Sequence, residues 1–157
     1  MNHTKYIKSD NSYSITQINP ENVKDALPAQ VYTLQFNPFR GYYLDITSDS
    51  LSVPKKLFGK TTYHSERLIQ AYEKTNSSLG ILLSGQKGSG KTMLSSNICN
   101  QMIDKGYPVI IIKESFTGDA FESFINLIGE CVLMFDEFGK TYDEEEQSKL
   151  LTFFDGL

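Results

Sequence analysis

Apolar residues recur in two different rhythms along the chain, and the rhythm changes near residue 53. Before that point, apolar and polar residues alternate in "QVYTLQF" (30–36) and again in "YYLDIT" (42–47), with the turn-like "NPFRG" between them. Alternation with a period of two is typical of β-strands, so these two runs predict a β-hairpin. The first dozen residues are polar and unpatterned, which predicts no ordered element there.

Downstream of residue 53, short and continuous apolar runs alternate with helical patterns, in which apolar residues lie three or four positions apart. Thr141 and Glu144 have the spacing of a capping box at the start of the last helical pattern. This alternation predicts an α/β fold whose parallel sheet is covered by helices on both faces. The predicted strands are "LGILLSG" (79–85), "YPVIIIK" (107–113) and "CVLMFD" (131–136), and the predicted helices are 65–74, 91–106, 119–129 and 141–154.

The same change of rhythm divides the chain into two predicted parts. Residues 1–53 form a small β-rich N-terminal region with the hairpin, and residues 54–157 form the α/β unit. The N-terminal region is rich in aromatic residues, and we expect most of them to pack in a small core rather than to form a partner-binding face. These aromatic residues are Tyr32, Phe36, Phe39, Tyr42 and Tyr43.

Composition narrows the classes of function. The 157 residues are 39% hydrophobic and 22% charged, which is ordinary for a globular protein. The net charge of −4 argues against a dedicated nucleic-acid-binding protein, and the basic cluster "PKKLFGK" (54–60) is expected to be a solvated loop. The apolar runs are too short for a membrane span or a signal peptide. The two cysteines are expected to be reduced and buried, as in a cytoplasmic protein.

One stretch, "GQKGSGKT" (85–92), matches the phosphate-binding pattern G-x-x-x-x-G-K-[ST] in full, between a predicted strand and a predicted helix. Glycines let the backbone curl so that its N–H groups converge on an anion, and the start of the helix adds a positive dipole end. In this pattern Lys91 reaches the β- and γ-phosphates, which makes it a candidate catalytic residue, and the Thr92 hydroxyl binds Mg²⁺. The predicted nucleotide-binding residues are Gly85, Gln86, Lys87, Gly88, Ser89, Gly90, Lys91 and Thr92.

Two carboxylates follow the last predicted strand, because "CVLMF" runs directly into Asp136 and Glu137. Ligands bind α/β sheets at the carboxyl ends of the strands, which predicts that these carboxylates lie beside the phosphate-binding loop. Asp136 is then expected to hold Mg²⁺, and Glu137 to polarise the water that attacks the γ-phosphate. The alternative is a pair of solvated acids that end a strand.

Together, "GILLSGQKGSGKT" and "CVLMFDE" resemble the corresponding motifs of AAA+ ATPases, and "LLTFFDGL" resembles the leucine-rich helix that follows the acidic strand in that family. "VPKKLFGK" ahead of "ERLIQAYEK" is similar to phage-encoded members. The resemblance covers residues 54–157 and implies a three-layer α/β/α P-loop NTPase fold with ATP and Mg²⁺ as cofactors. It also implies a cytoplasmic ATPase, in the host cytoplasm if phage-encoded, that forms a homo-oligomeric ring and remodels a macromolecular substrate.

Parts of the AAA+ pattern are missing from the sequence. No arginine follows Arg67, whereas a transition-state arginine raises phosphoryl-transfer rates by about 10³- to 10⁵-fold. The family's strand order also places a further strand between the phosphate-loop strand and the acidic strand, so that the edges of both should be unpaired here. We therefore expect an N-terminal portion of a longer ATPase, truncated after the helix that follows Asp136, which binds nucleotide and hydrolyses it poorly.

Two further correspondences and two other functions stay open. Phe116, with Thr117 and Gly118, is either a pore loop that grips substrate or core packing at a helix start. Phe58 with Gly59 is either part of an adenine pocket or an ordinary loop. A P-loop kinase that phosphorylates a small molecule is one alternative function, although a long segment precedes the phosphate loop. A nucleotide-binding switch or fragment without catalysis is the other.

Overall fold

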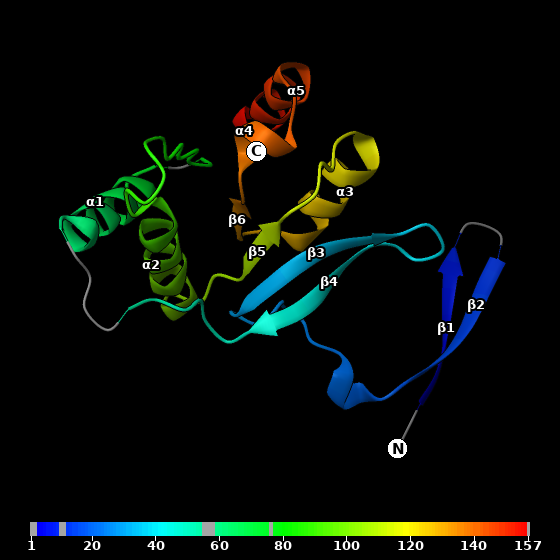
Figure 1. Cartoon of the computed structure of the whole chain (residues 1–157). Coiled ribbons are helices and arrows are strands. Elements are labelled where there is room, and N and C mark those ends of the chain that lie inside the picture. Colours follow the sequence, from blue (N-terminus) through cyan, green and yellow to red (C-terminus); the bar gives the residue numbers. More distant parts are fainter. Residues whose placement is uncertain (1–2, 10–11, 55–58, 76, 157) are drawn as a thin grey trace.

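The computed structural model describes residues 3–9, 12–54, 59–75 and 77–156. Among the helices in these ranges, none is long and apolar enough to cross a membrane. The strands are β1 (His3–Ser9), β2 (Ser12–Ile18), β3 (Val31–Asn37), β4 (Gly41–Ser48), β5 (Val109–Ile112) and β6 (Val132–Phe135) (Figure 1). The helices are the 3₁₀ helix η1 (Pro20–Asn22), α1 (Thr61–Glu73), α2 (Lys91–Asp104), α3 (Asp119–Ile128), α4 (Phe138–Thr141) and α5 (Glu144–Asp155).

Strands β3 to β6 form one sheet in the order β4-β3-β5-β6. β3 and β4 are antiparallel, whereas β3–β5 and β5–β6 are parallel, with Val109 opposite Val31 on one side and Val132 on the other. The hairpin predicted at 30–47 is confirmed, and its first strand joins the downstream strands directly. The fold is therefore α/β as predicted, but its sheet is mixed rather than parallel, because the hairpin adds an antiparallel strand at one edge.

The strands of this sheet contribute side chains to two hydrophobic clusters. β5 sends Ile110 and Ile112 into a large cluster with Phe121 of α3, which is fully buried, and Leu150 of α5. On β6, Leu133 packs against this large cluster, whereas Val132 packs against a smaller cluster formed by α1 and α2. Since successive side chains of a strand point to opposite faces, α3 and α5 lie on one side of the sheet and the α1–α2 pair on the other, as in Figure 1.

The aromatic residues of the N-terminal region divide between core and surface. Tyr32 is 3% exposed, and the ring of Tyr42 makes edge contacts with Phe116 and Phe121, so both belong to the large cluster. Phe36 and Phe39, at the β3–β4 turn, are exposed, which contradicts the expectation of core packing for these two. Phe39, in the turn itself, is fully exposed.

Residues 79–85, predicted as the strand before the phosphate-binding loop, form no strand in the structure. Leu79 is 37% exposed, Ile81 42% and Leu82 80%, so this apolar run lies largely in solvent. β6 ends the strand order, and no described strand pairs with its outer edge. Apolar side chains favour a strand, but a strand also needs a neighbouring backbone for its N–H and C=O groups. The outer edge of β6 is unpaired, as expected for the acidic strand. Residues 79–85 remain irregular, since no described strand pairs with them.

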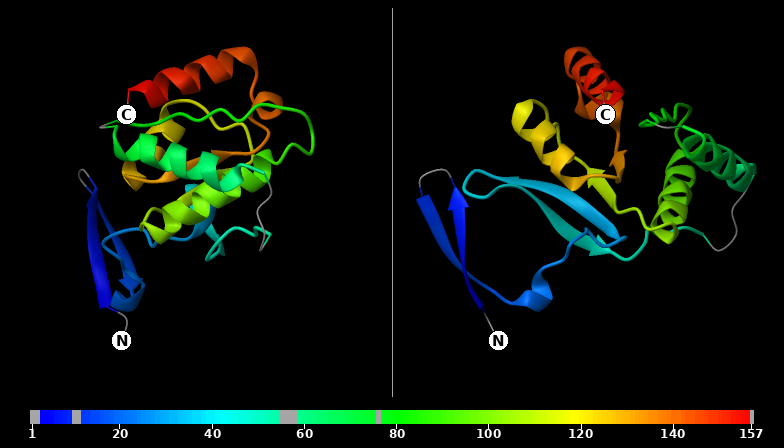
Figure 2. Two further views of the ribbon diagram at one scale, coloured as in Figure 1. Left: turned by 90° about the vertical axis from the view of Figure 1, so that its left-hand side faces the viewer. Right: turned by 180° about the vertical axis from the view of Figure 1, so that it is seen from behind.

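The first residues of the chain, for which no element was predicted, form an ordered hairpin. β1 and β2 are antiparallel, with Thr4 opposite Gln17 and Lys8 opposite Tyr13. The hairpin lies apart from the four-stranded sheet (Figure 2). The prediction was wrong because it rested on the polar composition of this segment. The segment also contains tyrosine, isoleucine and threonine residues, which favour strands even in a solvated position.

The helices predicted at 65–74, 91–106 and 119–129 form as α1, α2 and α3. Polar contacts hold α2 in place: the Ser65 hydroxyl of α1 accepts hydrogen bonds from Asn97 at 2.8 Å and Gln101 at 3.0 Å. On another side of α2, the Asn100 amide exchanges two 2.8 Å hydrogen bonds with the backbone of Leu51. α2 is thus fixed both to α1 and to the segment that follows β4.

The last helix begins later than predicted. α4 takes up Thr141, the backbone becomes extended at Tyr142, and α5 starts after Asp143. The capping box is formed by Asp143 and Glu146, whose side chains bond each other's backbone N–H, so the predicted Thr141–Glu144 box is wrong. Both pairs have the same spacing, and the short preceding helix decides between them.

Replacing Asp143 with alanine should lower the free energy of unfolding by about 1 kcal/mol, because the N–H of Glu146 then loses its acceptor. Asp143→Asn keeps an acceptor oxygen and should retain most of this stability. Chemical denaturation of both variants measures the difference. Equal losses in the two variants would show that the cap does not act through this hydrogen bond.

Both cysteines are free, Cys99 being buried and Cys131 half-buried. Burial raises the pKa of each thiol to about 11. At neutral pH both therefore stay protonated and react poorly as nucleophiles. The expectation of reduced, buried thiols holds for Cys99 and in part for Cys131.

Candidate functional site

The predicted phosphate-binding loop leads directly into α2. Its N-cap is Gly90, whose φ of 87° lies in the left-handed region, and Lys91 is the first helical residue. A side chain at Gly90 would strain this backbone, so the glycine of the pattern is needed for the turn. At the other end, a Cβ added to Gly85 would come 3.2 Å from the Ser89 hydroxyl. The pattern found in the sequence thus forms a tight turn that leads into the N-terminus of α2.

Lys91 folds back over this loop. Its ammonium donates hydrogen bonds to the carbonyl oxygens of Gly85 at 2.8 Å and Gln86 at 2.9 Å. An ammonium has three donors, so one remains for an anion even while both bonds are kept. The cation is therefore held at the loop by the loop's own backbone.

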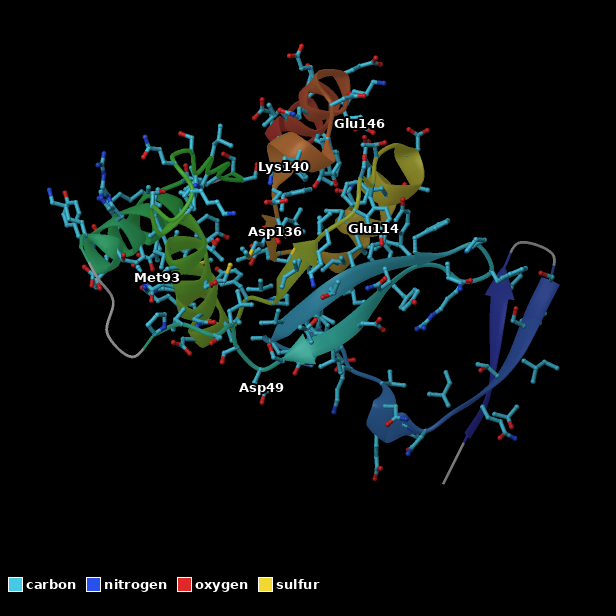
Figure 3. The ribbon with its side chains drawn as sticks, in the orientation of Figure 1. Asp49, Met93, Glu114, Asp136, Lys140 and Glu146 are labelled. Carbon is cyan, nitrogen blue, oxygen red and sulfur yellow. The ribbon has the colours of Figure 1, made fainter. Side chains whose placement is uncertain are left out.

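The two predicted acids lie where β6 leads into α4. Asp136 is labelled in Figure 3. The backbone N–H of Asp136 donates to the carbonyl of Ile112 at 3.2 Å, which extends the β5–β6 pairing by one step. Glu137 has a φ of 49°, a left-handed conformation that it shares with no other non-glycine residue in the described ranges. Such strain in a non-glycine residue is concentrated at functional positions, and here it turns the chain sharply after the strand.

Glu137 is largely exposed and forms an ion pair with one lysine. Lys140 of α4 donates a hydrogen bond to its carboxylate at 2.5 Å. This bond and the charge of Lys140 lower the pKa of Glu137, and the charge of Lys87 in the phosphate-binding loop lowers it further. The contact with Lys140 was not predicted from the sequence, although its position three residues after Glu137 is a spacing at which helical side chains meet.

A comparison with protein families gives a match that includes both the loop at 85–92 and the acids after β6. The family described as novel STAND NTPase 3 matches residues 61–155. The chain belongs to the novel STAND NTPase 3 family. The match runs from the first residue of α1 to the last residue of α5, and β1 to β4 lie before it. No curated protein and no solved structure gives a significant match.

Membership of the novel STAND NTPase 3 family identifies a nucleotide-binding NTPase domain of the P-loop class. This result is coarser than the AAA+ resemblance, which named a particular group and a phage-encoded type. The matched region contains both the loop at 85–92 and the acids that follow β6. Both predicted motifs therefore lie inside the NTPase domain.

Thr92 and Asp136 have the chemistry that a magnesium ion requires. Mg²⁺ prefers oxygen ligands and is usually held by one or two carboxylates together with phosphates. Both residues are exposed, and within the described ranges neither side chain makes a hydrogen bond or ion pair. The same ranges contain no cluster of three or more His, Cys, Asp or Glu side chains able to hold an ion without a nucleotide. The hydroxyl of Thr92 and the carboxylate of Asp136 supply the oxygen ligands that Mg²⁺ prefers.

The other predicted contacts lie in different surroundings. Phe116 is 8% exposed, and its backbone N–H donates to the Tyr142 hydroxyl at 3.2 Å, so core packing is the alternative that the structure supports. Phe58 lies outside the described residues, and Gly59 beside it is exposed.

An open groove between α3 and α5 is lined by Thr117 and Gly118 of the candidate pore loop and contains none of the residues predicted to bind nucleotide or metal. Lys149 on its rim is paired with Glu145 at 2.6 Å. We assign this groove no role in nucleotide binding.

Proposed function

We propose that the loop at 85–92 binds ATP together with Mg²⁺, and that the acids after β6 promote hydrolysis of the γ-phosphate. The backbone N–H groups of Gly85–Thr92 would bind the phosphates, and Lys91 would add its positive charge. Thr92 and Asp136 would hold the ion, which neutralises negative charge on the phosphates when bound. Glu137 would orient and polarise the attacking water.

One observation carries this proposal: the loop at 85–92 turns at the left-handed Gly90 into α2, and the Lys91 ammonium lies at the loop, bonded to the carbonyls of Gly85 and Gln86. A cation beside the N–H groups at a helix start is what phosphate binding requires, and Asp136 and Glu137 follow β6. The NTPase family supports nucleotide binding independently of this geometry. The adjacent Asp136–Glu137 pair favours an AAA+ type of ATPase, which would act as a homo-oligomeric ring on a macromolecular substrate in the cytoplasm.

A nucleotide-binding switch with little turnover is the second candidate. The Glu137 carboxylate is already bonded to Lys140, and a carboxylate engaged by an ammonium is a weaker base for water. The sequence also has no arginine after Arg67. Both features predict that the 157-residue chain binds ATP more readily than it hydrolyses it.

We expect ATP to bind this chain in the presence of Mg²⁺, with weaker binding in EDTA and slow release of inorganic phosphate. Equilibrium binding of a fluorescent ATP analogue, together with steady-state phosphate release at several protein concentrations, measures both properties. Turnover that rises with protein concentration would support assembly into a ring. ADP formed only with an added small-molecule acceptor would favour the kinase. Lack of binding with and without Mg²⁺ would reject the site.

A further inference from the structure

The β1–β2 hairpin has one protected and one unprotected edge. β2, with the sequence SYSITQI, contains no charged residue, proline or glycine, and its tyrosine, isoleucines and threonine favour strands. β1 carries the exposed Lys8. Lysines on an edge strand oppose pairing with further strands, whereas an uncharged edge accepts them. Among the described residues, β1 and β2 pair only with each other.

The hairpin also exposes apolar side chains. Tyr13 is 64% exposed and Ile15 is 70% exposed. Since side chains two positions apart share a face, these two lie on the same face of β2. A two-stranded hairpin alone is marginally stable in water, and three or more strands are needed for independent stability. The unpaired edge of β2 and its exposed apolar side chains both favour pairing with another strand.

We propose that this strand is β2 of a second copy of the chain, paired antiparallel about a two-fold axis at Ile15. Ile15 then lies opposite Ile15 of the second copy, and Tyr13 lies opposite its Gln17. The result is a four-stranded sheet in the order β1-β2-β2-β1. This contact does not depend on the proposed nucleotide site.

The distribution of charged residues determines which strand forms the interface and how many copies of the chain assemble. Pairing through β2 brings no like charges together, whereas pairing through β1 would bring the lysines of two copies to one interface. The sheet formed through β2 has a lysine-bearing β1 at each outer edge, so it does not extend further. A symmetric, self-complementary contact of this kind closes as a dimer rather than growing into a fibre.

Sedimentation velocity of the full chain without nucleotide, over a range of concentrations, should show a reversible monomer–dimer equilibrium. Ile15→Lys and Ile15→Glu should each raise the dimer dissociation constant at least about tenfold, because like charges then lie opposite each other across the axis and the apolar pair is lost. An equimolar mixture of the two variants places lysine opposite glutamate and should restore dimers. Thr4→Lys, a matched charge on exposed β1, should leave the equilibrium unchanged.

A chain that remains monomeric at every concentration would overturn the proposal. So would dimers that persist in Ile15→Lys, or assemblies larger than a dimer that Ile15→Lys abolishes. A local loss of hairpin structure is separated from loss of the interface by the mixture, since two misfolded hairpins would not recover dimers on mixing. Failure of the mixture to recover dimers therefore also counts against pairing through β2.

Discussion

Lys91→Ala should lower the affinity for ATP by about a hundredfold, since hydrogen bonds to charged groups contribute about 1.5–3 kcal/mol each. In the structure the Lys91 ammonium is bonded to the carbonyls of Gly85 and Gln86, where it completes the loop. Alanine removes the cation and leaves two exposed carbonyls that water can satisfy. The expected loss is therefore one of phosphate binding rather than of folding.

The control for Lys91→Ala is Lys24→Ala, which removes the same charge from an exposed position near η1. Its affinity for ATP should equal that of the unmodified chain. Titration calorimetry gives both dissociation constants, and circular dichroism checks that both variants are folded. Unchanged ATP affinity in Lys91→Ala would reject the assignment of 85–92 as the phosphate-binding loop.

The sequence predicted the backbone geometry at 85–92 more completely than it predicted the sheet. A phosphate-binding loop is encoded by residues that are consecutive, so Gly90 and Lys91 could be placed at the start of a helix from spacing alone. The strand predicted at 79–85 was wrong, because a strand needs a backbone neighbour and no described strand pairs with Ile81 or Leu82. Local backbone geometry can be predicted from one segment of the sequence, whereas strand pairing depends on two segments.

The same distinction explains the smaller errors. The capping box at Asp143 was misplaced because two overlapping segments have the same spacing, and the end of α4 determines which one begins α5. The contact of Glu137 with Lys140 was missed because it depends on the left-handed turn at Glu137, which no residue preference predicts. Both features depend on how the chain leaves one element before it enters the next.

Glu137→Gln should lower the rate of phosphate release by about a hundredfold or more, since a positioned general base contributes about 10²- to 10⁴-fold. Glutamine has nearly the same shape but is not a base, so it cannot polarise the attacking water. ATP affinity should stay within about threefold, because Glu137 is not assigned to the phosphates or the ion. Single-turnover phosphate release, with equilibrium binding measured beside it, separates the two effects.

Two variants show whether such a loss belongs to Glu137 itself. Glu130→Gln makes the same change at the opposite end of β6, where the side chain is exposed, and should not slow phosphate release. Lys140→Met breaks the ion pair with Glu137 but leaves the carboxylate, so it should not reproduce the loss and should raise turnover if the pair restrains the base. Normal turnover in Glu137→Gln would remove this residue as the group that activates water. A loss of equal size in Lys140→Met would instead place the essential function in the ion pair.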